Sequence, residues 1–415
     1  MVSTAKRTEL LDIVIVNDNA HANGGAGWIG LSSALALAKR GHKVTVFSAV
    51  APVMPALSAQ ENLNVVCTQQ YEILNDPNRL RAMIQGIWNA QAGRAMDELL
   101  ESLNPKRTII HIHTWSKALS TSAIRAALRR KFKVVLTLHD YLIACPSGTF
   151  FNHPKQEICT LKPLGMQCIQ ENCDTRKYAH KVWRMGRHLV QNNYGMLPAG
   201  LRHFIIYSEL SRSVLEPFLP NGATIHTVES PISVVQAPPV SVRENTAFTF
   251  LGRLAKEKGP LLFAEAAQRL QVESLFIGDG DCREALLEIN PKAKVTGWVE
   301  PKEAVNYLNQ ARALVLPSLW YEVQPLVVAE AAARGIPAIV PDTCAAREKV
   351  VDGVTGFWFK GGNVDDLVQK MAKLQDPQLS AQTGLAAYEH YWANPLTPER
   401  HVLQLQEVYK QILQC

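Results

Sequence analysis

The stretch from Ala313 to Asp342 reads ALVLPSLWYEVQPLVVAEAAARGIPAIVPD, and two short apolar runs bracket a longer segment within it. The runs Ala313–Leu316 and Ala338–Val340 are continuously apolar, which is typical of strands covered on both faces of a sheet. Pro325 lies between them and is favoured in the first turn of a helix. The stretch therefore predicts a strand, a crossover helix and a parallel strand, which is the repeating unit of an α/β sheet.

The same alternation runs through the whole chain and breaks once, in a segment rich in proline. The apolar runs that we predict as strands are residues 11–17, 43–47, 108–113 and 133–138 in the first half and 247–251, 274–277, 294–296, 313–316 and 338–340 in the second. We therefore predict two Rossmann-like α/β domains that face each other across a deep cleft, with ligands at the carboxyl ends of the strands. The expected boundaries are an N-terminal domain (1–235), a linker (236–246), a C-terminal domain (247–390) and a final helical segment (391–415) that packs back on the first domain.

Length and composition exclude several classes of protein. A chain of 415 residues is long enough for two or three domains, and its formal charge of +6 is far below that of a dedicated nucleic-acid binder. No apolar run is long enough to span a bilayer, and the start lacks the pattern of a signal peptide. We therefore expect a cytoplasmic protein that does not bind nucleic acid.

A glycine pattern near the N-terminus resembles the dinucleotide fingerprint but is placed differently. Gly25, Gly27 and Gly30 match G-x-G-x-x-G, yet seven residues, 18–24, separate Gly25 from the preceding strand. The second strand also ends at Ser48, with no carboxylate there to hold a ribose. We therefore exclude a nicotinamide or flavin site and expect a loop whose backbone N–H groups approach a ligand; a plain glycine turn is the alternative.

Charged residues in the second half point to a phosphate-bearing ligand. Arg253 and Lys258 follow a predicted strand and are suited to clamp a diphosphate, although a solvated basic loop is the alternative. Glu330 lies in an apolar helical segment, where burying a carboxylate is costly unless it meets hydrogen-bond donors such as ribose hydroxyls. The N–H groups around Leu326 and Val327, in the first turn of that helix, would face anionic phosphate.

Five segments occur in an order that resembles a known family. They are GRLAKEKG, FIGDGDCREAL, VTGWV, the stretch quoted above and EKVVDGVTGFWF, and they are similar to the retaining glycosyltransferases of family four, which have the GT-B fold. The resemblance implies that Arg253 and Lys258 bind the donor diphosphate and that Glu330 holds the ribose. It further implies that Glu322 contacts the transferred sugar, that Gly24 and Gly25 line the phosphates, and that Trp298 and Val299 lie beside the base.

The resemblance also implies a histidine near the transferred sugar. His139 follows the predicted strand at 133–138, and the adjacent Asp140 is expected to orient it. His111 and His113, on the preceding strand, are the alternatives. We therefore assign Glu322 and His139 as the catalytic residues.

Two further segments leave alternatives open. Cys145, Cys159, Cys168 and Cys173 lie in an insertion (145–175), where they would hold a structural metal or remain free thiols, a disulfide being the third choice. The basic segment 176–188 has five Arg or Lys residues and no acid, so it would either contact an anionic membrane or form a solvated helix.

Together these features predict a retaining, hexosyltransferase-type enzyme of bacterial polysaccharide or glycoconjugate synthesis. It would move a sugar from a nucleotide-diphosphate sugar to a saccharide or lipid-linked acceptor and require no cofactor. The alternative is a non-catalytic nucleotide-sugar-binding protein on the same fold. The sequence names neither the sugar, the base, the acceptor nor the oligomeric state.

Overall fold

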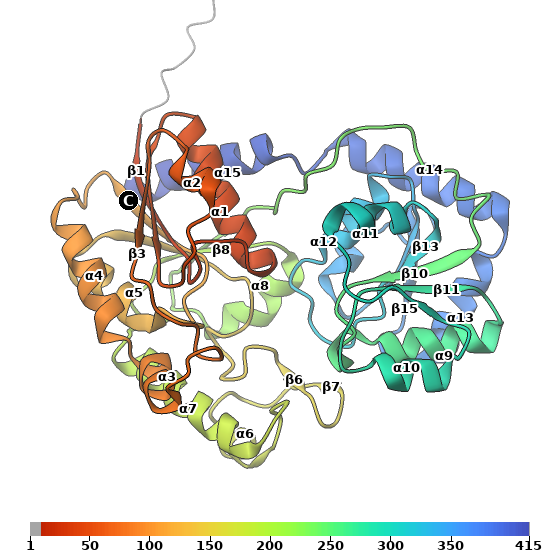
Figure 1. The fold of residues 1–415 in the computed structure, drawn as a ribbon, viewed down its shortest axis with the longest axis horizontal. Helices are drawn as coiled ribbons and strands as arrows, with labels where there is room; N and C mark the ends of the chain where they lie inside the picture. The colour runs from red at the N-terminus through yellow and green to blue at the C-terminus, as the bar shows by residue number, and fades with distance from the viewer. Residues whose placement is uncertain (1–9, 415) are drawn as a thin grey trace, which may run out of the picture.

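The computed structural model describes residues 10–414 and contains two α/β domains side by side (Figure 1). In the N-terminal domain, seven parallel strands follow the order β3-β2-β1-β4-β5-β8-β9. These strands are β1 (Asp12–Val16), β2 (Lys43–Ser48), β3 (Leu63–Cys67), β4 (Thr108–Ile112), β5 (Lys133–Thr137), β8 (His203–Ile206) and β9 (Thr224–Thr227). The helices around them are α1 (Gly24–Lys39), α2 (Pro55–Ser58), α3 (Arg79–Ile87), α4 (Ala90–Glu101), α5 (Ser120–Arg129) and α8 (Glu209–Leu215).

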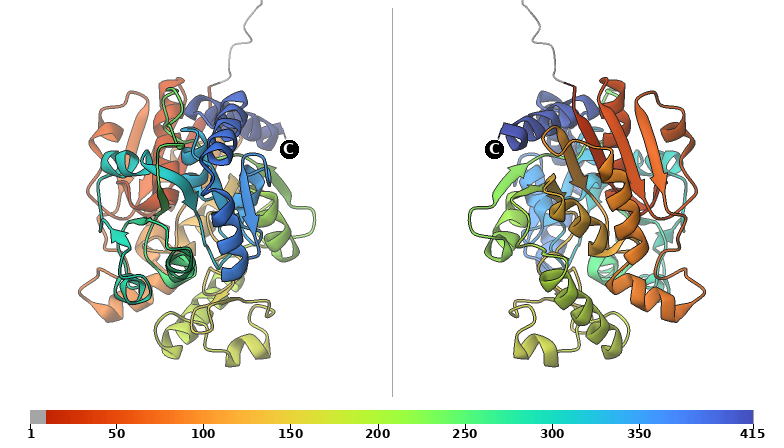
Figure 2. Two further views of the ribbon diagram at one scale, coloured as in Figure 1. Left: turned by 90° about the vertical axis from the view of Figure 1, so that its right-hand side faces the viewer. Right: turned by 90° about the vertical axis from the view of Figure 1, so that its left-hand side faces the viewer.

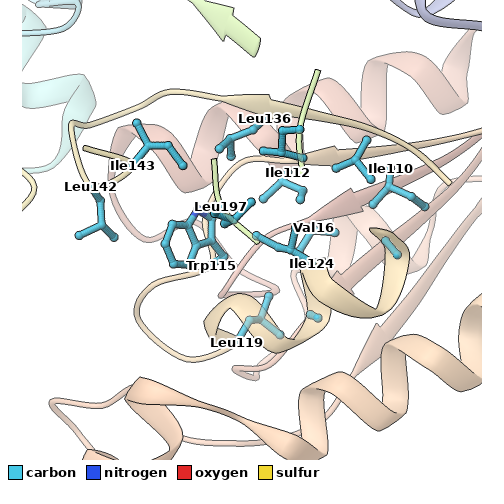
Figure 3. Close-up of a cluster of buried hydrophobic side chains, with 14 of the residues drawn as sticks. Val16, Ile110, Ile112, Trp115, Leu119, Ile124, Leu136, Leu142, Ile143 and Leu197 are labelled. Atoms are coloured by element: carbon cyan, nitrogen blue, oxygen red, sulfur yellow. The ribbon is translucent and has the colours of Figure 1, made fainter. Parts of the chain in front are cut away.

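Both faces of this sheet are covered, which explains why its strands are continuously apolar. Successive residues of β1 point to opposite faces, so Val14 and Val16 pack in one core and Ile13 and Ile15 in the other. Figure 3 shows part of the first core, where Trp115 and Leu119 pack beneath the ends of the central strands. The loops that follow the strands are thereby anchored to the interior.

The chain between β5 and β8 forms a separate lobe of short elements. It contains the hairpin of β6 (Phe151–Asn152) and β7 (Glu157–Ile158), then α6 (Met166–Gln170) and the longer α7 (Tyr178–Asn193). In both views of Figure 2 this yellow-green segment extends below the rest of the molecule.

The C-terminal domain repeats the design with six parallel strands in the order β12-β11-β10-β13-β14-β15. The strands are β10 (Ala247–Leu251), β11 (Ser274–Ile277), β12 (Lys294–Val295), β13 (Ala311–Val315), β14 (Ala338–Pro341) and β15 (Gly356–Phe359). The helices are α9 (Pro260–Leu270), α10 (Arg283–Ile289), α11 (Pro301–Leu308), α12 (Leu326–Ala332), α13 (Val364–Lys373) and α14 (Pro377–Ala393). The predicted pair of Rossmann-like domains is thus what the structure shows.

The last helix, α15 (Pro398–Gln414), lies over the N-terminal domain, as Figure 1 shows in blue. Its apolar face, which includes Val402, Leu405 and Tyr409, completes the core on the α1 side of the sheet. His401 and Gln406 add hydrogen bonds to Ser33 and His42 at 2.9 and 2.6 Å. The final helix therefore packs on the N-terminal domain, whereas the helix before it, α14, packs on the C-terminal domain. Within residues 10–414, no helix is both long and apolar enough to cross a membrane.

Candidate active site

A cavity of about 470 Å³ lies between the two domains, where the carboxyl ends of their strands face each other. The loops after β1, β4 and β5 supply Asp18, His113 and His139 from the N-terminal domain. Arg253, Lys258 and Trp320 complete the lining from the C-terminal domain. Of the predicted site residues, the structure brings Gly24, Gly25, His139, Arg253 and Lys258 to this one cavity.

Gly24 and Gly25 are the first two residues of α1, so the amino end of this long helix opens into the cavity. Asn23 precedes the helix but gives it no side-chain cap, because its amide donates a 2.8 Å hydrogen bond to Glu72. The first N–H groups of a helix lack partners within the helix and attract anions. Gly24 has a φ of +79° and an open space where a Cβ would be, which keeps this approach clear.

The two predicted cations are held by carboxylates beside the cavity. Arg253 donates a 2.6 Å hydrogen bond to Glu257, yet its side chain is 67% exposed. Lys258 contacts Glu322 at 2.5 Å and lies over the Trp320 ring at 5.4 Å. Both cations are therefore positioned by the protein before any ligand arrives.

Glu322 lies behind Lys258, and only 6% of it is exposed. Its carboxylate also accepts a 2.7 Å hydrogen bond from Ser318. Burial alone would raise the pKa of Glu322, but the charge of Lys258 and the hydrogen bonds outweigh it and lower this pKa. Glu322 is therefore ionised at neutral pH. It does not line the cavity itself but contacts Lys258, which does.

Glu330, in contrast, is half-buried on α12 and does not line the cavity. Burial raises its pKa, the nearby charge of Arg334 opposes that shift, and Arg334 donates its hydrogen bond to the backbone oxygen of Glu330 instead. Among residues 10–414 we find no hydrogen-bond donor for the Glu330 carboxylate, which therefore remains free to accept bonds from a ligand.

The other predicted donor contacts lie outside the lining of the cavity. Leu326 and Val327 are the first residues of α12 and are half-buried. Trp298 and Val299 lie between β12 and α11, and Trp298 is 73% exposed.

His139 is oriented by two aromatic neighbours, and the expectation that Asp140 orients it is wrong. Its ring nitrogens lie 3.1 Å from His113 and 3.1 Å from the hydroxyl of Tyr207. Asp140 instead accepts a 2.9 Å hydrogen bond from the backbone of Leu142, two residues on, in the local turn that Asp side chains favour. Burial and the charge of His401 lower the pKa of His139 to about 3, so this imidazole is neutral at neutral pH.

The two alternative histidines have separate roles. His113 lines the cavity, and its Nε2 is buried without a hydrogen-bond partner in the described chain. His111 lies deeper, with both ring nitrogens bonded at 2.6 Å, one to Tyr409 and the other to Thr137. His113 therefore belongs to the site together with His139, whereas His111 belongs to the contact with α15.

Sequence reasoning missed two residues that shape the site. Asp18 accepts hydrogen bonds of 2.9–3.0 Å from the backbone N–H groups of residues 117–119, which fixes the loop that forms one wall of the cavity. Tyr207 holds His139. Both residues follow a strand closely, Asp18 after β1 and Tyr207 after β8, and this position is the signal that could have identified them.

The four cysteines of the insertion, Cys145, Cys159, Cys168 and Cys173, line one small cavity as free thiols. The disulfide alternative is therefore not what the structure shows. In the described part of the chain, no three His, Cys, Asp or Glu side chains are arranged to hold a metal ion.

Two family models match the chain. One, described as "Glycosyl transferases group 1", matches residues 237–390, and the other, "Glycosyltransferase Family 4", matches residues 23–161. Between them they cover the facing parts of both domains.

Curated relatives match parts of the chain. A galactosyltransferase of Escherichia coli, named UDP-Gal:alpha-D-GlcNAc-diphosphoundecaprenol alpha-1,3-galactosyltransferase, is 30% identical over 33% of this chain and 38% of its own length. The glycogen synthase of Mycobacterium tuberculosis is 25% identical over 65% of this chain and 68% of its own. The chain thus matches little more than a third of the galactosyltransferase.

Solved structures match the fold along almost the full length. Sucrose-phosphate synthase from Thermosynechococcus elongatus has a TM-score of 0.70 at 16% identity, covering 97% of this chain and 99% of that one. HepE of Anabaena, solved with UDP and glucose, has a TM-score of 0.65 at 15% identity, covering 97% and 100%. At these identities the similarity shows the fold.

Proposed function

Because the chain belongs to the glycosyltransferases of family four, we propose that it transfers a hexose from a nucleotide-diphosphate sugar to a saccharide or lipid-linked acceptor. The observation that carries this proposal is the cavity between the domains. There, two cations of one domain face a free helix N-terminus and a neutral histidine of the other.

The diphosphate of the donor would lie between Arg253, Lys258 and the start of α1. The two side chains and the helix N–H groups supply positive charge from opposite walls, so they would stabilise the nucleotide diphosphate as it leaves. We infer that this reaction does not depend on a bound metal, because these groups offset the charge that a metal would otherwise neutralise.

The remaining residues would contact the other parts of the donor, namely the nucleoside, the phosphates and the transferred sugar. The free carboxylate of Glu330 would accept hydrogen bonds from ribose hydroxyls, which would satisfy a group that burial disfavours. Trp298 and Val299 would lie beside the base, and the N–H groups of Leu326 and Val327 would face the phosphates. His139, with His113 beside it, would contact the transferred sugar.

Glu322 would act near the reacting carbon while keeping Lys258 in position. Retention of the anomeric configuration is the outcome we expect from the family.

The relatives support the choice of substrates. The Escherichia coli galactosyltransferase is named for a UDP-sugar donor and a diphosphoundecaprenol acceptor, and HepE is described with UDP and glucose. We therefore propose a UDP-hexose as the first donor to test, with a polyprenyl-diphosphate sugar as acceptor, in bacterial polysaccharide or glycoconjugate synthesis. A cytoplasmic location stays a prediction.

The test measures release of free nucleotide diphosphate from a panel of nucleotide sugars, with and without candidate acceptors. Acceptor-dependent release, with the new linkage in the donor's anomeric configuration by NMR, supports the proposal. Tight binding of a nucleotide sugar without release for any acceptor would favour the alternative, a nucleotide-sugar-binding protein.

A further inference from the structure

The hairpin of β6 and β7 in the cysteine-containing insertion extends toward the C-terminal domain (Figure 1). The Nδ1 atom of His153, the first residue after β6, lies 3.9 Å from Oε2 of Glu257. Glu257 belongs to the 3-10 turn Lys256–Lys258, between β10 and α9. Because the two side chains are only 12% and 9% exposed, the insertion meets the other domain through a buried pair of titratable groups.

The carboxylate of Glu257 also holds one of the two cations of the cavity. Its Oε1 accepts the 2.6 Å hydrogen bond from Arg253, while Oε2 is the oxygen that faces His153. Arg253 lines the cavity, whereas Glu257 and His153 do not. Glu257 therefore connects a residue of the insertion to a cation that we assign to the donor diphosphate.

Burial and four charged groups set the charge of His153. Burial lowers the pKa of His153, the carboxylates of Glu257 and Asp174 raise it, and the cations Arg184 and Arg253 lower it. Asp174 and Arg184 are paired with each other at 2.9 Å, so their effects on His153 oppose each other. The lowered pKa makes His153 neutral at pH 7 while Arg253 stays beside Glu257.

A bound donor would change this balance. The Arg253 side chain is 67% exposed, so it is free to turn from Glu257 toward a diphosphate. Glu257 would then keep its buried charge without a cation, and an unpaired buried carboxylate is costly. A proton taken from the solvent by His153 would supply the missing positive charge at the same carboxylate.

We propose that His153 is a positioning residue for the donor complex. It takes up a proton when the diphosphate draws Arg253 away from Glu257, and the new ion pair holds the insertion against the C-terminal domain. The only covalent bond formed is the second N–H bond of the imidazolium, and Arg253 keeps its own protons. This inference rests on the proposed function, because it requires a diphosphate at Arg253.

The hairpin is held firmly within the insertion. The amide of Asn152 donates a 2.9 Å hydrogen bond to Glu171, and Lys155 pairs with the same carboxylate at 3.0 Å. The backbone N–H of His153 donates to the backbone oxygen of Cys173 at 3.4 Å. Binding of the donor in the C-terminal domain would therefore fix the position of the whole insertion, which follows the cavity wall after β5.

The first test needs no ligand and follows His153 by NMR of the full chain with carbon-13-labelled histidine. The signal that is missing from His153→Gln identifies this residue. Arg253→Ala removes the cation from Glu257 permanently, so the proton affinity of His153 should rise about tenfold or more. The matched control is Arg129→Ala on α5, because Arg129 is 65% exposed and paired with Asp97 at 3.1 Å, and it should leave His153 unchanged.

The second test is calorimetry with UDP-glucose at pH 6.5 in PIPES and in imidazole buffer, which differ in ionisation enthalpy. The diphosphate of UDP-glucose does not titrate in this range, so any proton uptake belongs to the protein. We expect a net uptake of about 0.3 proton or more per donor in the wild type and none in His153→Gln. The control His226→Gln removes a half-buried histidine of β9 and should take up protons like the wild type.

An unchanged proton affinity of His153 in Arg253→Ala, or equal proton uptake by the wild type and His153→Gln, would overturn the proposal. Binding of UDP-glucose without proton uptake would also overturn it and would leave the proposed function intact. If no nucleotide sugar of the panel bound, while Arg253→Ala raised the proton affinity of His153, the proposed function alone would be refuted, because the link between Arg253 and His153 is measured without a donor.

Discussion

The ion pair between Lys258 and Glu322 connects the fold of the C-terminal domain to its site, and a double-mutant cycle measures it. The Nζ–Oε1 distance is 2.5 Å, and the side chains of Lys258 and Glu322 are 26% and 8% exposed. Removing one partner of a buried pair costs about 3–5 kcal/mol. Because Lys258 is partly exposed and Glu322 keeps its bond to Ser318, we expect Lys258→Met to lower the free energy of unfolding by about 2–3 kcal/mol.

In the cycle, Lys258→Met, Glu322→Gln and the double variant are compared with the wild type by urea unfolding at pH 7. The double variant leaves no unpaired charge, so the coupling energy should be about 1–2 kcal/mol. The control cycle uses Arg269 and Asp365, which are 2.7 Å apart but 45% and 76% exposed, and should give a coupling energy below about 1 kcal/mol.

The pH dependence gives an independent check on the same pair. The pKa of Glu322 is lowered in the folded protein, so its contribution to stability is present above the ordinary value of 4.5 and is lost as the pH falls through the lower folded value. Glu322→Gln should therefore lose less stability than the wild type over that acidic range. A coupling energy within about 0.5 kcal/mol of zero, together with identical pH profiles, would refute the assignment of a stabilising buried pair.

Four further predictions concern the cavity. Arg253→Ala should weaken donor binding in calorimetry by about tenfold or more, as expected for a lost charge-assisted hydrogen bond. It should also lower the stability, because its partner Glu257 is only 9% exposed and would lose its cation; unchanged donor affinity would contradict the role of Arg253 in the site. Glu330→Gln should raise the free energy of unfolding at pH 7, because the raised pKa of Glu330 means that stability falls as the pH rises above 4.5. The same variant should bind the donor more weakly. Urea unfolding and calorimetry on one sample measure both effects, and an unchanged donor affinity would contradict the role of Glu330 in binding the ribose. Tyr207→Phe should lower kcat about tenfold or more with little change in the donor KM, because it removes the hydrogen bond to His139 without altering the diphosphate site. Steady-state rates of nucleotide release measure both constants. A normal kcat would show that Tyr207 is not a positioning residue. Chelation by EDTA should leave nucleotide release unaffected. If EDTA abolished release and Mg²⁺ restored it, Arg253, Lys258 and α1 alone would not be enough to stabilise the leaving diphosphate.

Local patterns predicted the arrangement of strands and helices because burial on a sheet depends on neighbouring residues. In β1, Ile13 and Val14 point to opposite faces, and both are buried, so the run is apolar throughout. The positions of His139 and Arg253 followed from the same signal, since each comes just after such a run. The family resemblance extended these assignments to Glu322 and Glu330.

The prediction for Asp140 failed because sequence proximity says little about which group a side chain bonds. Asp140 is adjacent to His139, but its carboxylate is satisfied within its own turn. His139 instead meets Tyr207, 68 residues away, and His113 on the neighbouring strand.

The sequence by itself therefore determined the α/β alternation, the placement of charged and glycine residues at strand ends, and the family to which the chain belongs. Only the tertiary structure decided the partners: Lys258 with Glu322, His139 with Tyr207, and His111 with a tyrosine of α15 that is 298 residues away. The physical reason is the distance along the chain over which each effect acts. Periodicity and turn chemistry act over a few residues, whereas hydrogen bonds and ion pairs form between whichever groups the packed sheets bring within about 3 Å.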